Sequence, residues 1–328
     1  MIGGGSIAGA VNHPLQIHTR IAIIGTGGIG APLGASLAQA GAEVTFLARG
    51  AHLAAIRAHG LRIEGDRGTA HIHPAQATDD PASTGVMDYV LFCVKLWDVE
   101  SAGETIRPMI GPHTAVLPLQ NGIDAAERLF PILGRDAVMG ASALVTGSII
   151  APGVVRQTGA YQTISFGEWD GRSSARGEKL RDLCAQAGFE GVLSPDITLA
   201  IWDKFALLAP YAGVCALTRL PAGKWRDDPD VFALYAGALA ETAAIGFALG
   251  VNFPADIVAR KCAFVRENLP THHMASMGND VVNGNRTELD WLPGKVVALG
   301  REYGIATPVS SFLYAALKLY RNGPPAPL

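Results

Sequence analysis

Charged side chains are scarce in this chain of 328 residues: Asp, Glu, Lys and Arg make up only 17%, and the formal net charge is −3. Soluble proteins usually carry about 25%, so long disordered segments are not expected. A net charge near zero provides no basic surface, and no nucleic-acid partner is expected. With 49% hydrophobic residues, much of the chain must be buried, and part of it could lie in the interface of a homodimer.

Cysteine and long apolar runs are scarce as well. The four cysteines are far apart and form no C-x-x-C pair, which favours a reducing, cytoplasmic location without disulfides or a zinc site. His272 and His273 are adjacent and lack further ligands, so no metal is expected. The longest uncharged stretches, 205–218 and 231–240, fall short of the ~20 residues that a membrane-spanning helix needs. They are interpreted as core helices, and no membrane partner is expected.

Residues 1–19 lack the charged segment that opens a signal peptide, and they are interpreted as a flexible extension. After them, short apolar runs alternate with helical patterns. The runs that predict strands are 20–25, 43–48, 88–95, 115–120, 138–145 and 189–192, and 28–40 and 173–187 predict helices. Residues 153–168 predict a hairpin at a sheet edge. This alternation favours a parallel sheet covered by helices on both faces.

The second half has a different pattern. Long helical patterns rich in Ala, Leu and Val cover 197–218, 230–250, 255–283 and 287–303, and strand-like alternation disappears. Ser194-Pro195 predicts a turn between the halves. The chain is therefore divided into an extension at 1–19, an α/β domain at 20–193 and an all-helical domain at 194–328.

A glycine-rich turn follows the first predicted strand. Gly25-Thr26-Gly27-Gly28-Ile29-Gly30 contains G-x-G-x-x-G between a strand and a helix, the context that dinucleotide binding requires. The first glycine permits a tight turn, the second lets a pyrophosphate approach the backbone, and the third lets the helix pack on the strand. Free N–H groups at the helix start then face the phosphates. The alternative is a glycine-rich turn that binds nothing.

Three further residues follow other predicted strands, at the carboxyl edge where open α/β sheets bind ligands. Arg49 stands where NAD-binding proteins usually have an acidic residue, and it favours the 2′-phosphate of NADP. Lys95 could add positive charge near the adenosine phosphates. Asn121 belongs to an Asn-Gly pair, which is also a common turn. A solvated arginine and a surface lysine are the alternatives for the first two.

Six ordered segments together resemble the ketopantoate reductase (2-dehydropantoate 2-reductase) family. They are GTGGIG at 25–30, VKLWDV at 94–99, LQNG at 119–122, WDK at 202–204, SMGND at 276–280, and TELD at 287–290 followed by GKVV at 294–297 and GIATP at 304–308. The resemblance covers residues 20 to about 310. It implies an N-terminal Rossmann-type doubly wound parallel sheet and an all-α C-terminal domain, with the active site in a cleft between them.

The resemblance also implies an activity. It is that of an NADP-dependent oxidoreductase acting on CH–OH, which uses NADPH to reduce the C2 ketone of a small 2-oxo acid, converting ketopantoate to pantoate in pantothenate biosynthesis. The family's catalytic lysine and glutamate fall on Lys204 and Glu288. Its serine for the substrate carboxylate falls on Ser276, and its asparagine near the nicotinamide and substrate on Asn121. The arginine for the 2′-phosphate falls on Arg49.

These roles agree with the chemistry of ketone reduction. Negative charge develops on the carbonyl oxygen, where the ammonium of Lys204 could stabilise it and donate a proton. Desolvation in a cleft lowers the pKa of a lysine and eases that transfer. Thr287 and Asp290 have capping-box spacing, which predicts Glu288 at a helix start facing the cleft. Without the resemblance, Lys204 and Glu288 could equally form an interdomain salt bridge or be exposed charges.

The sequence departs from the family beside Lys204. Leu208 and Ala212 replace two family asparagines that bind the polar substrate, and His273 replaces a third. An unpaired buried polar group costs ~1–3 kcal/mol, so a more apolar oxo acid is the alternative substrate. A module that binds NADP as a sensor without turnover is the third hypothesis. Tyr211 could restore a hydroxyl to this substrate-binding face or be a core residue.

Overall fold

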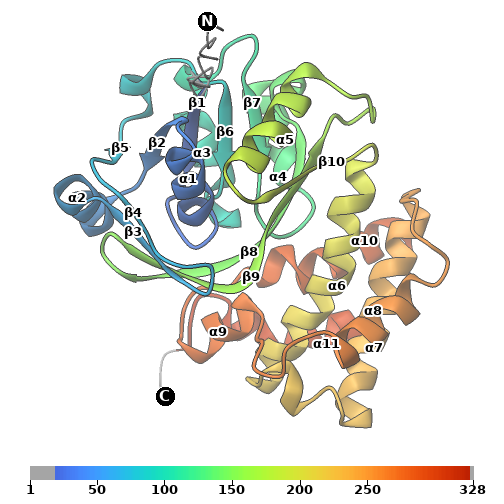
Figure 1. Ribbon diagram of the computed structural model, residues 1–328. Helices are drawn as coiled ribbons and strands as arrows, with labels where there is room; N and C mark the ends of the chain where they lie inside the picture. The colour runs from blue at the N-terminus through green and yellow to red at the C-terminus, as the bar shows by residue number, and fades with distance from the viewer. Residues whose placement is uncertain (1–18, 326–328) are drawn as a thin grey trace, which may run out of the picture.

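The computed structural model describes residues 19–325 (Figure 1). The extension predicted at 1–19 lies outside the described residues except for Thr19, which is 1% exposed and whose carbonyl accepts a hydrogen bond from the N–H of Glu43. Residues 326–328 also lie outside the described residues.

A five-stranded parallel sheet forms the centre of the first half (Figure 1). Its strands are β1 (Arg20–Ile24), β2 (Glu43–Leu47), β5 (Gln76–Thr78), β6 (Tyr89–Phe92) and β7 (Ala115–Pro118). Their order is β5-β2-β1-β6-β7, and all four pairings are parallel. The next two strands of this sheet along the chain, β2 and β5, therefore lie on one side of β1, whereas β6 and β7 lie on its other side. Ligands of open α/β sheets bind at such a switch point.

The alternation of side chains along β1 explains why the sheet is covered on both faces. Ile21 and Ile23 belong to one apolar cluster and Ala22 and Ile24 to another, and all four are nearly inaccessible. Residues of a strand point alternately to its two faces. The helices of this half are α1 (Gly30–Gln39), α2 (Gly50–His59), α3 (Val99–Thr105), α4 (Ala125–Leu133) and α5 (Ala175–Gln186). The predicted Rossmann-type doubly wound sheet is confirmed.

A second sheet was not predicted. It contains β3 (Leu61–Gly65), β4 (Ala70–Ile72), β8 (Gly140–Ala151), β9 (Val154–Gly167) and β10 (Glu190–Leu193), in the order β10-β9-β3-β4 with β8 paired to β9. The hairpin predicted within 153–168 is wrong. Residues 154–167 form one strand, and the hairpin joins β8 to β9 around Gly153. Gly159 marks a bulge, since the register shifts between Val145 and Thr146 opposite it.

The second half is helical, as predicted. Its helices are α6 (Ile197–Thr218), α7 (Pro229–Ala248), α8 (Ile257–Glu267), α9 (Ser276–Val282), α10 (Pro293–Tyr303) and α11 (Pro308–Leu317). In Figure 1, α6 runs from the sheet half into the helical half. The single helix predicted over 255–283 is wrong, because the chain breaks between α8 and α9 in a segment that contains Pro270. The helix predicted over 287–303 begins only at Pro293, after a short 3-10 turn.

Helices α6 and α7 are 22 and 20 residues long and apolar enough to cross a membrane by length and composition. These helices are longer than the uncharged stretches 205–218 and 231–240, because α6 also includes Lys204 and α7 also includes Glu241. Of their apolar windows, 61% and 50% is buried inside the protein. Core helices of soluble proteins have the same character, so the membrane signal is weak.

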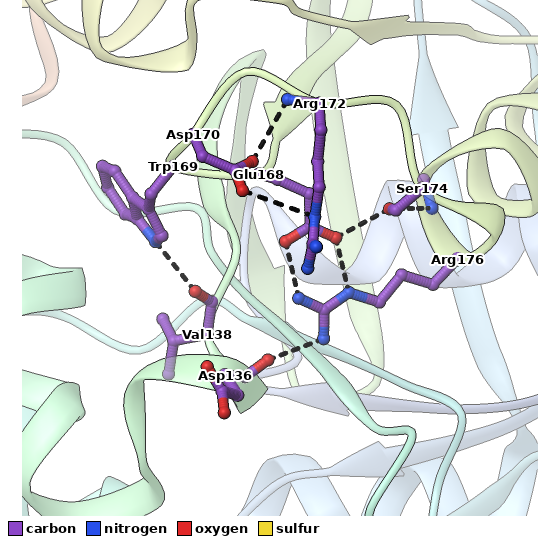
Figure 2. A network of polar contacts seen from close by, with 9 residues as sticks. Asp136, Val138, Glu168, Trp169, Asp170, Arg172, Ser174 and Arg176 are labelled. Carbon is purple, nitrogen blue, oxygen red and sulfur yellow. Dashed lines mark hydrogen bonds and ion pairs between the residues drawn. The ribbon is translucent and has the colours of Figure 1, made fainter.

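A polar network holds α5 against the end of β9 (Figure 2). The Glu168 carboxylate accepts hydrogen bonds from the Arg176 guanidinium at 2.7 and 2.8 Å and from the Ser174 hydroxyl at 2.7 Å. Arg176 also donates to the carbonyl of Asp136, and its hydrogen bonds to the Glu168 carboxylate hold the pKa of Glu168 below its usual range. The carbonyl of Arg176 accepts from Tyr89, the first residue of β6. This network therefore lies at the amino edge of the parallel sheet, opposite the glycine turn.

Candidate active site

The carboxyl ends of the parallel strands bring together the predicted cofactor-binding segments. The glycine turn follows β1, Arg49 follows β2, Lys95 follows β6 and Asn121 follows β7. Because these strands are parallel neighbours, the four segments share one edge of the sheet. The structure thus places these predicted residues on the ligand-binding side of a Rossmann-type domain.

Two glycines of the turn are required by close packing. Gly25 has φ +94°, and a Cβ there would come 2.9 Å from the backbone of Cys93. A Cβ at Gly30 would collide with the carbonyl of Gly25 and the side chain of Ile23. The turn is also fixed to β2, because the hydroxyl and the N–H of Thr26 both donate to the Leu47 carbonyl, at 2.8 and 3.2 Å.

The middle of the turn fits a dinucleotide. Around a Cβ built on Gly27 no atom lies within 4 Å, so the backbone there faces open space. This is the position at which a pyrophosphate approaches the main chain in a Rossmann turn. Helix α1 starts at Gly30, and its first N–H groups add a partial positive charge on the same side. The open backbone at Gly27 and the start of α1 therefore fit the diphosphate of a dinucleotide.

Arg49 is exposed and immediately precedes α2. Within residues 19–325 its guanidinium has no hydrogen bond or ion pair, so its charge is available to an anion. Lys95 is engaged differently: its Nζ lies 3.7 Å from a carboxylate oxygen of Asp280 on α9 and 5.6 Å from the ring centre of Trp97. Lys95 therefore links the sheet half to the helical half as well as lying at the strand end.

Asn121 lies beside a buried amide. The side-chain nitrogen of Gln120 donates to the carbonyl of Phe92 at 2.9 Å, whereas its buried oxygen has no partner. Asn121 itself is half-buried, at the turn that follows β7. A buried acceptor without a partner at this edge is consistent with a ligand that carries a donor.

Lys204 is half-buried in α6 and reaches across to the sheet half. Its Nζ donates a 2.7 Å hydrogen bond to the carbonyl of Ala143 on β8. Desolvation lowers the pKa of Lys204 to about 8, against the opposing effect of the Glu288 carboxylate. Among the described residues Lys204 forms no salt bridge, so the interdomain salt bridge with Glu288 is not found.

Glu288 is 4% exposed and also joins the two halves. Its Oε1 accepts a 3.3 Å hydrogen bond from the N–H of Leu96, directly after Lys95. The predicted capping box is wrong: Glu288 precedes a 3-10 turn without a side-chain cap, and Asp290 instead accepts from the Tyr314 hydroxyl. Glu288 nevertheless reaches the sheet half, because the chain runs back toward β6 before α10 begins.

The predicted substrate residues differ in their surroundings. Ser276 is exposed at the start of α9. Tyr211 is 3% exposed, and its hydroxyl donates to the carbonyl of His273 at 2.7 Å while its ring stacks on the imidazole. On the same helix, Leu208 is half-buried and Ala212 is fully buried. The apolar character predicted for this part of α6 is therefore present in the structure.

Two contacts of the site were not predicted from the sequence. Ala143 binds Lys204 through its backbone, and a backbone carbonyl leaves no residue-specific signal. His52 on α2 lies beside the glycine turn, where its Nε2 is 2.9 Å from the carbonyl of Thr26. Its position three residues after Arg49 was the available sequence signal. No group of three or more potential metal ligands occurs within the part of the chain that the structure describes.

The geometry defines a class of protein. A dinucleotide turn at the switch point of a Rossmann-type sheet is connected through β8 to an amine of lowered pKa from the helical half. Such an amine can transfer a proton to or from oxygen, and a nicotinamide, when bound, would supply or accept a hydride. The protein is thus an oxidoreductase that acts on CH–OH groups with NAD(P).

Comparison with known proteins identifies the family. The model of the ketopantoate reductase family PanE/ApbA matches residues 21–171, and the model of its C-terminal domain matches residues 196–321. The chain belongs to the ketopantoate reductase family. A 2-dehydropantoate 2-reductase from Mesorhizobium japonicum is 30% identical over 322 residues, covering 91% of this chain and 97% of the relative. The resemblance noted from the six sequence segments is confirmed.

Solved structures agree with this assignment. A PanE/ApbA family ketopantoate reductase from Ralstonia eutropha has a TM-score of 0.84 at 32% identity, covering 92% of this chain and 98% of that one. A D-mandelate dehydrogenase solved with NADH and anilino(oxo)acetate has a TM-score of 0.85 at 21% identity, covering 92% and 98%. The second likeness shows a shared fold only.

Proposed function

We propose that the protein reduces the C2 ketone of a 2-oxo acid with NADPH, with 2-dehydropantoate as the default substrate and pantoate as the product. The proposal rests on one observation: β8 contacts both Lys204 and the glycine turn. Ala143 on this strand binds Lys204, and Gly147, four residues later, packs against Gly28 of the glycine turn. Four strand residues span about 13 Å, a separation between the turn and the amine that a nicotinamide riboside can bridge.

In this mechanism the nicotinamide, when bound, supplies a hydride to the ketone carbon. Lys204 acts on the ketone oxygen: its ammonium offsets the developing negative charge and then donates a proton to form the hydroxyl. A pKa of about 8 makes that proton easier to release than from an ordinary lysine. The Ala143 carbonyl holds the amine through a single hydrogen bond, so its other N–H bonds can reach substrate.

Glu288 keeps the lysine protonated. Its carboxylate raises the pKa of Lys204 and is itself held by the N–H of Leu96. Asn121 would orient the nicotinamide and the substrate, and the exposed Ser276 hydroxyl would bind the substrate carboxylate. For Tyr211 the substrate-binding role stays a prediction, and it would require the hydroxyl to exchange its bond to His273.

The choice of NADPH over NADH rests on Arg49. Its guanidinium is exposed and unpaired within residues 19–325, at the end of the strand where the adenosine ribose binds in this fold. Arginine binds phosphate through several charge-assisted hydrogen bonds. Lys95 would add a second charge if its contact with Asp280 loosened.

An alternative substrate, a more apolar oxo acid, is favoured by Leu208 and Ala212. Neither side chain can pair with a substrate hydroxyl, and an unsatisfied hydroxyl costs ~1–3 kcal/mol. The deciding experiment measures kcat/KM for 2-dehydropantoate and for straight and branched 2-oxo acids by NADPH absorbance. A lead of more than about tenfold for 2-dehydropantoate excludes the alternative. If no oxo acid accelerates NADPH oxidation, the proposed reduction is wrong.

The domain boundary at residue 193, a cytoplasmic location and a homodimer are further proposals. The boundary is supported by the start of α6 at Ile197, and a reducing compartment by the free state of all four cysteines. Exposed apolar side chains of the helical half, such as Phe312 and Leu319, favour contact with a second copy.

A further inference from the structure

His52 connects two segments that are far apart in the sequence. It lies in the first turn of α2. Its Nε2 is 2.9 Å from the carbonyl of Thr26 in the glycine turn, and its Nδ1 is 3.0 Å from the backbone nitrogen of Gly153. Gly153 lies in the turn between β8 and β9. A single imidazole therefore bridges the dinucleotide turn and the β8–β9 hairpin.

These two partners determine which nitrogen carries the proton. The Gly153 N–H can only donate, so Nδ1 of His52 must be the acceptor and carries no hydrogen. The Thr26 carbonyl can only accept, so Nε2 must carry the hydrogen and donate it. The imidazole is thus neutral with one defined tautomer. Burial lowers the pKa of His52, which agrees with this neutral state.

Holding the Thr26 carbonyl also orients the next N–H. The peptide unit between Thr26 and Gly27 is planar and trans, so its carbonyl and its N–H point in opposite directions. A carbonyl directed at His52 therefore directs the Gly27 N–H away from α2. The other bonds of Thr26 cannot do this, since its hydroxyl and its own N–H both bind Leu47 and leave this peptide plane free to rotate.

We propose that His52 is a positioning residue for the cofactor diphosphate, acting through the Thr26 carbonyl to aim the Gly27 N–H at a phosphate oxygen. The inference rests on the proposed use of a nicotinamide dinucleotide. Two observations support it: a Cβ on Gly27 would meet open space, and within residues 19–325 the Gly27 N–H donates no hydrogen bond. His52 itself would not touch the cofactor.

The Gly153 contact gives the histidine a fixed support. Gly153 has φ +77°, and a Cβ there would approach the Cβ of Ala55 on α2 at 3.1 Å, so the hairpin turn packs tightly on the same helix. The hairpin contacts the glycine turn again where Gly28 meets Gly147, and a side chain at either would collide with the other's backbone. These contacts therefore fix the position of β8, the strand that carries Ala143, relative to the glycine turn.

The two bonds can be separated by amide substitutions. The amide of Gln reaches the place of Nε2, so His52→Gln retains a donor for Thr26 but loses the acceptor for Gly153. The shorter Asn reaches the place of Nδ1, so His52→Asn does the reverse. His52→Ala removes both. His59→Ala, in the last turn of the same helix, is the matched control, because its exposed ring has no partner within residues 19–325.

The experiment measures the Kd of NADPH for each purified full-length variant by calorimetry, with the melting temperature of the free protein recorded beside it. We expect His52→Ala and His52→Asn to raise the Kd by about 5- to 30-fold, the usual scale for losing such a hydrogen bond. His52→Gln and His59→Ala should stay within about threefold of the parent.

A Kd for His52→Gln that is no better than that for His52→Asn overturns the inference, as do unchanged Kd values for all variants. If His52 has a purely structural role, the melting temperatures of the His52 variants fall, but the Kd values of NADPH for His52→Gln and His52→Asn do not differ. If His52→Ala does not fold, the Gln and Asn pair still decides. A parent protein that binds neither NADPH nor NADH contradicts the proposed function itself, whereas a parent that binds with unaffected variants contradicts only the role of His52.

Discussion

The Nζ of Lys204 donates a 2.7 Å hydrogen bond to the carbonyl of Ala143, which attaches the amine of the helical half to a strand of the sheet half. The acceptor is neutral, so this bond positions the amine without cancelling its charge. Further contacts join the same halves: they are Glu288 with Leu96, Lys95 with Asp280, Lys295 with Asp124 at 3.1 Å, and Arg128 over the Trp291 ring. The lysine is thus held by the same interface that holds the domains together.

Replacing Lys204 by alanine should remove most of the activity. We expect a loss of at least ~3 kcal/mol in transition-state stabilisation, or about 150-fold in kcat/KM, the scale for removing one donor to a developing oxyanion. The Kd of NADPH should change little, because the contacts of the glycine turn do not involve Lys204. Lys224→Ala, an exposed lysine of the same half, is the control. A tenfold weaker binding of NADPH, or nearly normal turnover, would contradict the assigned role.

The rate should depend on pH through Lys204. Reduction needs the ammonium form, so kcat/KM for a 2-oxo acid should be level at low pH and fall about tenfold per unit above pH 8. Oxidation of the hydroxy acid needs the neutral amine, so kcat/KM for that direction should rise over the same pH range and then level off. Initial rates in both directions provide the test, and parallel profiles would exclude this lysine as the proton donor.

The same shift has a consequence for stability. The folded-state pKa of about 8 lies below the ordinary value of 10.5. Between these two values the unfolded chain binds more protons, so the contribution of Lys204 to the free energy of unfolding increases as pH rises through this window. Denaturant titrations of the parent and of Lys204→Met should show that the difference in free energy of unfolding between the two proteins moves in favour of the parent as pH rises through this window.

Glu288 is expected to tune that titration. Its carboxylate raises the pKa of Lys204, so Glu288→Gln should move the fall in kcat/KM to lower pH. Glutamine retains an acceptor for the N–H of Leu96, which keeps the contact between the halves. Asp290→Asn, which changes a neighbouring acid bonded to Tyr314, serves as the control. An unchanged pH profile in Glu288→Gln would show that the carboxylate does not act on the lysine.

The sequence predicted elements well where local and tertiary signals agree. The run RIAIIG and the helix over 197–218 appear as β1 and α6 almost to the residue. It failed where a tertiary partner decides the outcome. Residues 153–168 indicated two extended segments around a turn, but pairing along β8 makes residues 154–167 one long strand with a bulge at Gly159. Strands β3 (LRIEG) and β4 (AHI) were missed because charged or polar residues interrupt their apolar ones, and because they pair only with β9 and with each other.

The candidate site shows the same division. The glycine turn has a motif because two of its glycines meet steric requirements within the protein, as the collisions at Gly25 and Gly30 demonstrate. Lys204 and Glu288 were found only through an ordered resemblance, since single charged residues have no local signature. Their partners, the carbonyl of Ala143 and the N–H of Leu96, are backbone groups that any residue would supply. Such contacts are determined by the fold and are visible only in the structure.

Arg49 should decide between the two nicotinamide dinucleotides, which differ only by the 2′-phosphate. Losing a hydrogen bond to a charged group costs ~1.5–3 kcal/mol, so Arg49→Ala should raise the Kd of NADPH by about 10- to 150-fold. The Kd of NADH should change less than about threefold. Arg57→Ala, on the adjoining helix α2, is a matched control, because its guanidinium is already paired with Asp79 at 3.3 Å. Calorimetric titration of each variant with both dinucleotides provides the measurement, and equal losses for NADPH and NADH would exclude a 2′-phosphate contact at Arg49.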